Sequence, residues 1–198
     1  MANSKNLQKT IDGLINRVFL RFIPKSVRPN HITVIRFLLT PIIFIFLQSQ
    51  KFDIALAIFI IAASTDFIDG AMARTRNQIT DIGKIIDPIA DKLLILSVIS
   101  SIGFDYLIVK IFIVVIFIEL LSIFISASFS IKFGRPIGAN IFGKMKMILQ
   151  SFGVGLFIIG ILAKNDLVIH ISEGILFVAL IFAILSGLMH LWLRIKRT

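Results

Sequence analysis

Long apolar stretches dominate this chain and restrict what it can fold into. They lie near residues 33–49, 53–73, 84–103, 107–129, 142–163 and 170–193. A helix needs ~20 residues to cross the hydrocarbon core of a bilayer, so six crossings use most of the 198 residues. Backbone in lipid must satisfy its own hydrogen bonds, which favours helices throughout. The sequence therefore predicts an all-α integral membrane protein with six transmembrane helices.

Composition agrees with a membrane protein and excludes several other classes. Hydrophobic residues make up 57% of the chain, whereas soluble domains are usually ~45–50% apolar. The net charge of +10 comes from Lys and Arg residues spaced between apolar runs. This spacing suits contact with anionic lipid headgroups, so we expect no nucleic-acid partner. The chain has no cysteine, which excludes disulfides, thiol nucleophiles and thiolate metal sites.

The first 30 residues differ from the rest. Residues 7–23 place apolar side chains at helical spacing with charges between them, as in an amphipathic helix that lies on a membrane surface. A soluble helix packed on the domain is the alternative. The segment lacks the unbroken apolar core of a signal peptide. We therefore predict a juxtamembrane segment at 1–30 and a six-helix domain at 31–198.

Basic residues predict the orientation. With six spans both termini share a side, and sixteen Lys and Arg residues fall on that side against three on the other. The three are Lys51, Lys110 and Lys164, while Arg36 and Lys92 fall inside spans and were not counted. Because basic loops stay in the cytoplasm, we expect a multi-pass protein of the inner cell membrane with cytoplasmic termini.

Carboxylates are rare here and concentrated. Five of the eleven acidic residues lie between positions 66 and 91. Asp66 and Asp69 are three apart at the end of the second span, and Asp87 and Asp91 are four apart at the start of the third. Both spacings put a pair on one helix face. The connection between the spans is short, so the two helices should pack antiparallel and bring the pairs together at the cytoplasmic side.

Four carboxylates this close repel one another unless cations separate them. Hard ions such as Mg²⁺ or Mn²⁺ suit carboxylate oxygens, and two of them can stabilise charge in phosphoryl transfer. The alternative is a set of helix-end acids in ordinary ion pairs with Arg74, Arg76 and Lys84. Arg74 also suits a phosphate, and small residues around it allow close approach to the backbone.

Taken together, the segment is Asp66-x2-Asp69-Gly70-x2-Ala73-Arg74-x8-Gly83-x3-Asp87-x3-Asp91. It resembles the signature of the CDP-alcohol phosphatidyltransferases, and the likeness in length and layout covers most of the chain. The resemblance implies transfer of a phosphatidyl group from CDP-diacylglycerol to an alcohol with release of CMP, and commonly a homodimer. By the same resemblance, Asp66, Asp69, Asp87 and Asp91 bind two metal ions and Asp91 is also the general base.

The resemblance also implies a site for the CDP-lipid. Its residues would be Pro29, Asn30, Thr33, Gly70, Ala73, Arg74, Thr80 and Gly83. Pro29 and Asn30 alternatively mark a helix start, with Thr33 as its cap.

The run Gly143-Lys144-Met145-Lys146 followed by Gln150 is similar to a run in one subgroup of that family, the bacterial phosphatidylglycerophosphate synthases. Arg36 and Pro41 fit that subgroup as well. The implied acceptor is a small phosphorylated alcohol, glycerol 3-phosphate, held by basic side chains. These would be Lys132, Arg135, Lys144 and Lys146, which alternatively are only the basic charges of a cytoplasmic face.

Two features leave the acceptor open. Ile118 precedes Glu119 where the subgroup often has Arg, and Met147 stands where Thr is frequent. Glu119 is an acid inside a span, with either a functional role or a buried hydrogen bond to a neighbouring helix. Other acceptors remain as alternatives: inositol phosphate, serine, or a second phospholipid as in cardiolipin synthase. Different classes are a divalent-cation transporter and a non-catalytic membrane scaffold. We interpret the Gly153, Gly155 and Gly160 cluster as close helix packing.

Overall fold

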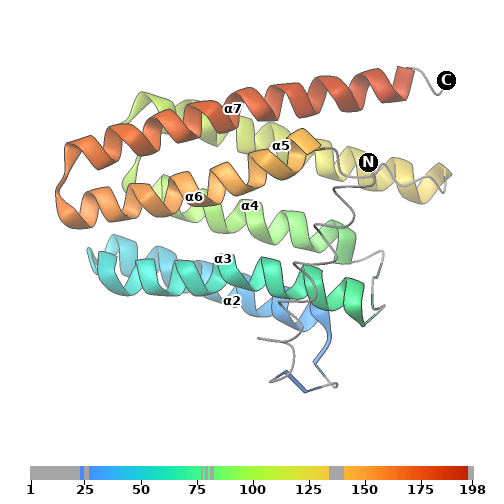
Figure 1. The fold of residues 1–198 in the computed structure, drawn as a ribbon, viewed down its shortest axis with the longest axis horizontal. Coiled ribbons are helices and arrows are strands. Elements are labelled where there is room, and N and C mark those ends of the chain that lie inside the picture. Colours follow the sequence, from blue (N-terminus) through green and yellow to red (C-terminus); the bar gives the residue numbers. More distant parts are fainter. Residues whose placement is uncertain are drawn as a thin grey trace.

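The computed structural model describes residues 23–24, 27–76, 78, 80, 83–133 and 141–195. Within these residues it is all helical, and the helices run alternately up and down the molecule (Figure 1). In chain order they are α2 (Pro29–Gln48), α3 (Phe52–Thr75), α4 (Gly83–Ile102), α5 (Leu107–Phe133), α6 (Ile141–Ala163) and α7 (Asp166–Ile195). The six predicted helices are confirmed, whereas the amphipathic helix predicted at 7–23 lies almost wholly outside the described residues.

The ends of two helices differ from the prediction. α2 begins at Pro29 and not near residue 33, because a proline at the first helical position needs no hydrogen-bond partner for its nitrogen. Thr33 is therefore inside the helix, and its predicted role as a cap is wrong. α7 begins at Asp166, where the side chain of Asn165 accepts a hydrogen bond from the Val168 backbone at 3.2 Å.

Two tight turns close helix pairs at the end of the molecule away from the acidic motif. Between α6 and α7, the Asn165 N–H donates to the Gly160 carbonyl at 3.0 Å and the Lys164 N–H donates to Ile161 at 3.1 Å. This pattern requires a left-handed residue just after the helix, and Lys164 supplies it with φ 51°. Gln50 occupies the same place between α2 and α3 with φ 57°. Because neither residue is glycine, both turns carry some backbone strain.

α4 is the central helix of the bundle. It lies between the α2–α3 pair and the α5–α7 group (Figure 1), and none of its described side chains is exposed. Around it, buried apolar residues of every described helix form one continuous core. α6 packs along α7, and α2 packs along both α3 and α4. A Cβ on Gly160 would lie 2.8 Å from the Ile169 side chain and one on Gly153 2.9 Å from Leu176, so these glycines do permit close packing.

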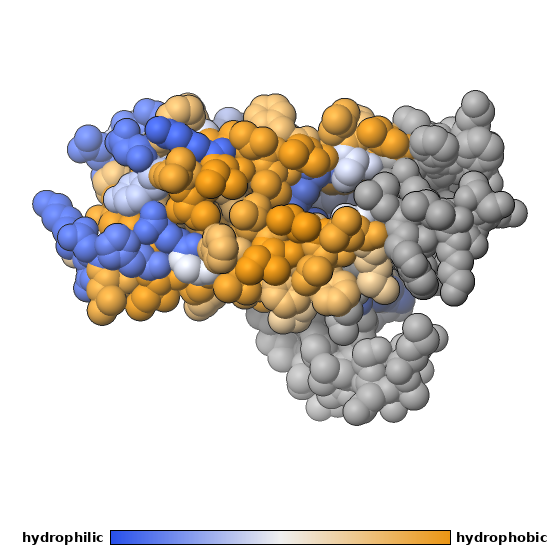
Figure 2. Space-filling model, turned by 90° about the horizontal axis from the view of Figure 1, so that it is seen from above, coloured by the Kyte–Doolittle hydropathy of each residue, from blue (hydrophilic) through white to orange (hydrophobic). Residues whose placement is uncertain are grey.

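The surface agrees with a membrane environment. Five of the six described helices are long and apolar enough to cross a bilayer. The exception is α4, which carries Asp87, Asp91 and Lys92 in its first half. Its central position explains how these charges are tolerated, since they face protein and not lipid. Apolar side chains cover the middle of the molecule, and polar ones gather at one end (Figure 2). On α5 the exposed apolar residues include Val114, Phe117, Ile118 and Leu121.

Candidate active site

A buried arginine joins the first pair of aspartates. Arg36, on α2, is fully buried and reaches the end of α3. Its guanidinium lies 3.3 Å from an oxygen of Asp66 and 2.9 Å from an oxygen of Asp69. It also donates to the Thr65 hydroxyl and to the Ala62 carbonyl. A charge this deep is stable only when paired and fully hydrogen-bonded, so Arg36 fixes the direction of both carboxylates.

The second pair of aspartates is joined to the same helix. The Thr33 hydroxyl of α2 donates to an oxygen of Asp87 on α4 at 2.6 Å. α2 therefore contacts both acidic pairs, through Arg36 to the pair on α3 and through Thr33 to the pair on α4. The sequence predicted that α3 and α4 would pack antiparallel against each other and so bring the pairs together. The structure differs, because these two helices share only a small contact and α2 packs against both.

Asp91 is almost completely buried, as Asp69 also is. Its relative exposure is 4%, and its Oδ2 atom has no hydrogen-bond partner among the described residues. Asp66 lies within electrostatic range of Asp69, Asp87 and Asp91. The four carboxylates therefore act on one another in a single region, which we call the aspartate cluster. An unpaired buried carboxylate oxygen is costly, so this one needs a partner from outside the described residues.

The aspartate cluster has the donor atoms of a hard-cation site, but among the described residues they are not arranged as a complete set of ligands. Oxygen donors from carboxylates are what Mg²⁺ and Mn²⁺ prefer. In the part of the chain that the structure describes, however, no group of three or more His, Asp or Glu side chains is arranged to hold one metal ion. Arg36 and Thr33 engage oxygens of three of the aspartates. The oxygens that remain, above all Oδ2 of Asp91, fit a cation by donor type and charge.

Residues predicted to contact the CDP-lipid gather beside Asp87. The Thr80 hydroxyl donates to the Asn30 side chain at 3.3 Å and accepts from the Gly83 N–H at 3.0 Å. A Cβ on Gly83 would lie 2.9 Å from the Thr80 hydroxyl and 3.0 Å from the Asn30 oxygen. Gly83 is therefore required for this approach. Pro29 lies one residue before Asn30, at the buried start of α2.

The remaining predicted CDP-lipid residues lie on the last turns of α3. A Cβ on Gly70 would lie 3.2 Å from the Arg74 guanidinium, so the arginine side chain folds back over the glycine. Ala73 is half-buried beside it. Arg76, suggested as an alternative partner for the acids, donates hydrogen bonds to the carbonyls of Ile23, Pro24 and Val27. It thereby ties the segment before α2 to α3.

A second charged cluster lies on the other side of α4. Lys92 and Lys146 each approach a different oxygen of Glu119, at 2.7 Å and 3.2 Å. Gln150 accepts a short hydrogen bond from Lys92 and donates to Glu119 at 3.4 Å. These four side chains, from α4, α5 and α6, form what we call the lysine cluster. Glu119 and Lys92 are both buried. A charged side chain inside a membrane is costly, so each of these two charges faces the other and not lipid.

A small cavity of about 160 Å³ connects the two clusters. Its charged lining consists of Asp91, Lys92, Glu119, Lys144 and Lys146. Of the four basic residues predicted to bind the acceptor, Lys144 and Lys146 therefore reach one cavity beside Asp91. Arg135 lies outside the described residues, and so does the side chain of Lys132.

Residues 26–189 match the family model described as CDP-alcohol phosphatidyltransferase. The chain belongs to this family.

Individual relatives match a similar share of this phosphatidyltransferase. It is 31% identical over 174 residues to the CDP-diacylglycerol–glycerol-3-phosphate 3-phosphatidyltransferase of Rickettsia felis, covering 80% of this chain and 90% of that one. The Bacillus subtilis protein of the same name is 32% identical over 180 residues, again covering 80% of this chain and 90% of the relative. The chain is thus a membrane enzyme that transfers a phosphatidyl group, as the sequence motif indicated.

Sequence reasoning missed the main partners of the charged residues in the phosphatidyltransferase. Arg36 and Lys92 were set aside as basic residues inside spans, yet each is the cation that holds a buried carboxylate. A signal was present, because a charge within an apolar span needs a partner. The spacing of residues within each helix does not reveal which neighbour supplies that partner.

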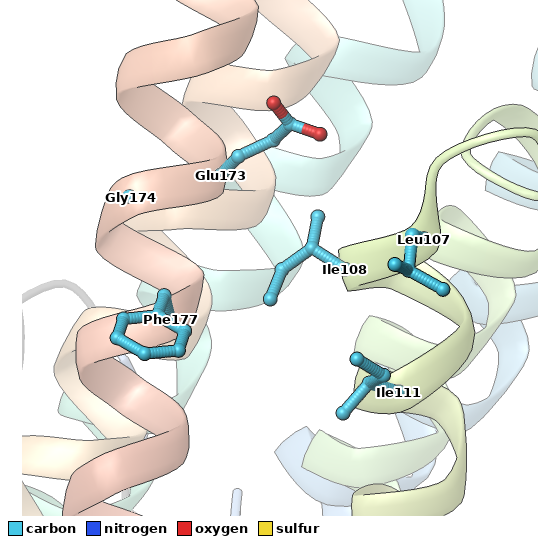
Figure 3. Close-up of a pocket in the computed structure, with 6 residues that line it drawn as sticks. All are labelled: Leu107, Ile108, Ile111, Glu173, Gly174 and Phe177. Carbon is cyan, nitrogen blue, oxygen red and sulfur yellow. The ribbon is translucent and has the colours of Figure 1, made fainter.

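A larger cavity than the one beside Asp91 lies away from the site. About 420 Å³ in volume, it lies between the starts of α5 and α7, lined mainly by Leu107, Ile108, Ile111 and Phe177 (Figure 3). Its one charged lining residue, Glu173, pairs with His170 at 2.9 Å. Chemistry decides against this cavity: it is lined by apolar groups, whereas the smaller one contains the convergent charges that phosphatidyl transfer requires.

Proposed function

We propose that this enzyme transfers the phosphatidyl group of CDP-diacylglycerol to glycerol 3-phosphate, giving phosphatidylglycerophosphate and CMP. The observation that carries the proposal is the position of Asp91, a buried aspartate with an unpartnered oxygen between an acidic and a basic cluster. The names of the Rickettsia and Bacillus relatives support the same acceptor.

Asp91 acts as the general base in this proposal. The acceptor hydroxyl oxygen attacks the phosphorus that carries the diacylglycerol. As the new phosphorus–oxygen bond forms, the bond to the bridging oxygen breaks and CMP leaves with that oxygen. The hydroxyl proton passes to the Asp91 carboxylate. A base inside a protein pocket contributes most when it is within hydrogen-bond reach of this proton, and Asp91 lines the cavity in which the acceptor would sit.

Asp66, Asp69, Asp87 and Asp91 would hold two Mg²⁺ or Mn²⁺ ions. When bound, such ions supply charge stabilisation for the phosphates. Arg36 then keeps Asp66 and Asp69 in place, and Thr33 does the same for Asp87. The donor types fit these ions, and the unpartnered Asp91 oxygen is the position most in need of a cation.

The CDP end of the lipid would lie against Asn30, Thr33, Thr80 and Gly83, with Arg74 folded over Gly70 for the phosphates. Because Gly83 has no side chain, Thr80 and Asn30 can approach the start of α4 beside Asp87. Lys144 and Lys146, with Lys132 and Arg135, would receive the acceptor phosphate, because amines and guanidinium groups are suited to it. We also propose that this end faces the cytoplasm, that the protein forms a homodimer, and that 1–30 is a separate amphipathic segment.

The alternative of a divalent-cation transporter gains no support from these contacts. An ion path needs acids spread through the bilayer midplane. The aspartates gather at one end of α3 and α4, and the deeper Glu119 is held by two lysines.

The deciding experiment measures CMP release from CDP-diacylglycerol by the purified protein in detergent. We expect release only when glycerol 3-phosphate and Mg²⁺ or Mn²⁺ are both present, and none after chelation with EDTA. Serine, inositol phosphate and phosphatidylglycerol are tested in parallel. Faster release with one of these would replace the proposed acceptor. A folded protein that releases no CMP with any alcohol would overturn the proposal.

A further inference from the structure

Glu119 is the one acid in the cavity that the proposed reaction does not use. It is buried between α4 and α6, and its two oxygens are divided between two ammonium groups. We infer that Glu119 is a positioning residue: it holds the Lys146 ammonium at a fixed place beside Asp91, and this selects a phosphorylated acceptor. The inference rests on the proposed function and names the device that sets its acceptor specificity.

The two lysines of this cluster are held differently. Lys92 has two acceptors, Glu119 and Gln150, and its side chain is 4% exposed. Lys146 has Glu119 at the longer distance of 3.2 Å, and its side chain is 15% exposed. Lys92 is therefore locked in the protein interior, whereas Lys146 can exchange one anionic partner for another. Lys146 is the residue placed to meet an incoming phosphate.

The Glu119 carboxylate allows Lys92 and Lys146 to lie close together in the protein interior. Two ammonium groups buried side by side repel each other strongly in a low-dielectric interior. Glu119 offsets that repulsion by forming an ion pair with one lysine through each oxygen. Without its charge, the more exposed Lys146 would move away from Lys92, out of the position it now has in the cavity.

The position of Lys146 matters because Asp91 is near. Lys146 lies within electrostatic range of Asp91, and both line the same cavity. A phosphate held by Lys146 therefore places the rest of a short acceptor toward Asp91. Glycerol 3-phosphate carries its phosphate and its primary hydroxyl at opposite ends of three carbons. An alcohol without a phosphate has nothing to bind Lys146, and its hydroxyl is not directed to the base.

The test compares Glu119→Gln with wild type in the CMP-release assay, with glycerol 3-phosphate and glycerol as acceptors. Glutamine keeps the shape and removes the charge. Once Lys146 has moved away, the acceptor phosphate loses its hydrogen bond to that ammonium group, so we expect KM for glycerol 3-phosphate to rise about 10- to 100-fold. The KM for CDP-diacylglycerol should stay unchanged, and the preference for glycerol 3-phosphate over glycerol should fall by a similar factor. Glu173→Gln, at the opposite end, is the matched control and should leave both KM values unchanged.

A second background separates positioning from simple packing. In Lys92→Gln, Glu119 has Lys146 as its single cationic partner and competes with the acceptor phosphate for it. Adding Glu119→Gln to that variant should therefore lower KM for glycerol 3-phosphate, although the same change raises it in wild type. In the double variant only the partly exposed Lys146 is left without its ion-pair partner and the buried Lys92 charge is gone, so it tests the inference even if Glu119→Gln alone does not fold.

The outcomes are distinguishable. A wild-type enzyme that releases no CMP with glycerol 3-phosphate refutes the proposed function itself. If wild type is active and Glu119→Gln leaves its KM and its acceptor preference unchanged, only the role of Glu119 is refuted. The same holds if the substitution raises KM in both backgrounds, since Glu119 would then contact the acceptor or serve packing alone.

Discussion

The aspartate cluster and the lysine cluster lie on two sides of the same helix and are built in opposite ways. In the first, there are four carboxylates and one buried guanidinium, that of Arg36, which pairs with two of them. In the second, two ammonium groups share one carboxylate, that of Glu119. The first is thus short of positive charge and the second short of negative charge. Each cluster is suited to a ligand of the sign it lacks: cations for one, a phosphate for the other.

Two successive residues of α4 connect the clusters. Asp91 and Lys92 are neighbours in the sequence, and consecutive residues on a helix point about 100° apart. Asp91 lies within electrostatic range of the aspartate cluster at Asp66, whereas Lys92 bonds Glu119 and Gln150 on the other side. The central position of α4 therefore brings the proposed base and the proposed phosphate site together. A helix on the outside of the bundle would turn one of the two toward lipid.

The largest effect is expected at Asp91, where the two clusters meet on α4. Asp91→Asn removes the proposed base, so kcat should fall by about 10²- to 10⁴-fold while KM for CDP-diacylglycerol changes little. CMP release measures the loss, and gel filtration with circular dichroism checks that the protein is folded. Asp53→Asn, an exposed aspartate at the start of α3, is the control and should keep full activity. Full activity of Asp91→Asn would remove Asp91 as the base.

The next largest effect concerns the shared cation of the aspartate cluster. Arg36→Met leaves two carboxylates without their buried partner, which costs about 3–5 kcal/mol of stability when measured in EDTA. Thermal unfolding in detergent should show a lower Tm. Mg²⁺ or Mn²⁺ should restore more of that loss than it adds to wild type, because the freed oxygens can bind the ion.

Arg28→Met provides the control for this prediction, since Arg28 is exposed at the same end of α2. Its Tm should equal that of wild type in EDTA. An Arg36→Met protein as stable as wild type in EDTA would show that the aspartates do not depend on the arginine, and the contrast between the two clusters would then be lost.

A smaller effect is expected from the contact between α2 and α4. Thr33→Val keeps the shape of the side chain but removes the 2.6 Å hydrogen bond to Asp87. A hydrogen bond to a charged group is worth roughly 1.5–3 kcal/mol, so Tm should fall less than in Arg36→Met. Thr40→Val is the comparison, because the Thr40 hydroxyl bonds a carbonyl of its own helix. An equal loss in both variants would argue against a special role for Thr33.

The smallest effect lies far from both clusters and should leave them unaffected. Lys164 adopts a left-handed conformation with φ 51°, which costs a non-glycine residue about 1 kcal/mol. Lys164→Gly should therefore raise Tm slightly without changing either KM, whereas Lys164→Ala keeps the strain and should bring no gain. A change in acceptor KM in Lys164→Gly would mean that the two ends of the bundle are coupled.

Much of the fold followed from local patterns. Apolar runs of membrane length predicted all six helices, and small residues such as Gly153 and Gly160 predicted close packing, which the Leu176 and Ile169 contacts confirm. The sequence also indicated a helix start at Pro29, but it did not predict the role of Thr33. Its side chain bonds Asp87, 54 residues away in the sequence, and no local pattern records such a contact.

In the candidate site too, some features followed from the sequence and others appeared only in the structure. The spacing of Asp66, Asp69, Asp87 and Asp91 marked the acidic motif, and the run at Lys144 and Lys146 marked a basic one. The sequence could not say that Arg36 of α2 would neutralise two of the acids or that Lys92 would bond Glu119. Both cations were left out of the charge count because they fall inside spans, and the partner of each lies on a different helix.

The amino-acid sequence by itself determined the membrane-spanning helices, the acidic motif and the family to which the chain belongs. These depend on composition and on periodicity within single helices, which are local properties. Only the tertiary structure decided which charges share a cavity: α2 contacts both acidic pairs, and α4 lies at the centre with Asp91 and Lys92 directed into different clusters. The reason is physical, since a buried charge is stabilised by neighbours that helix packing, and not the order of residues, brings within hydrogen-bond distance.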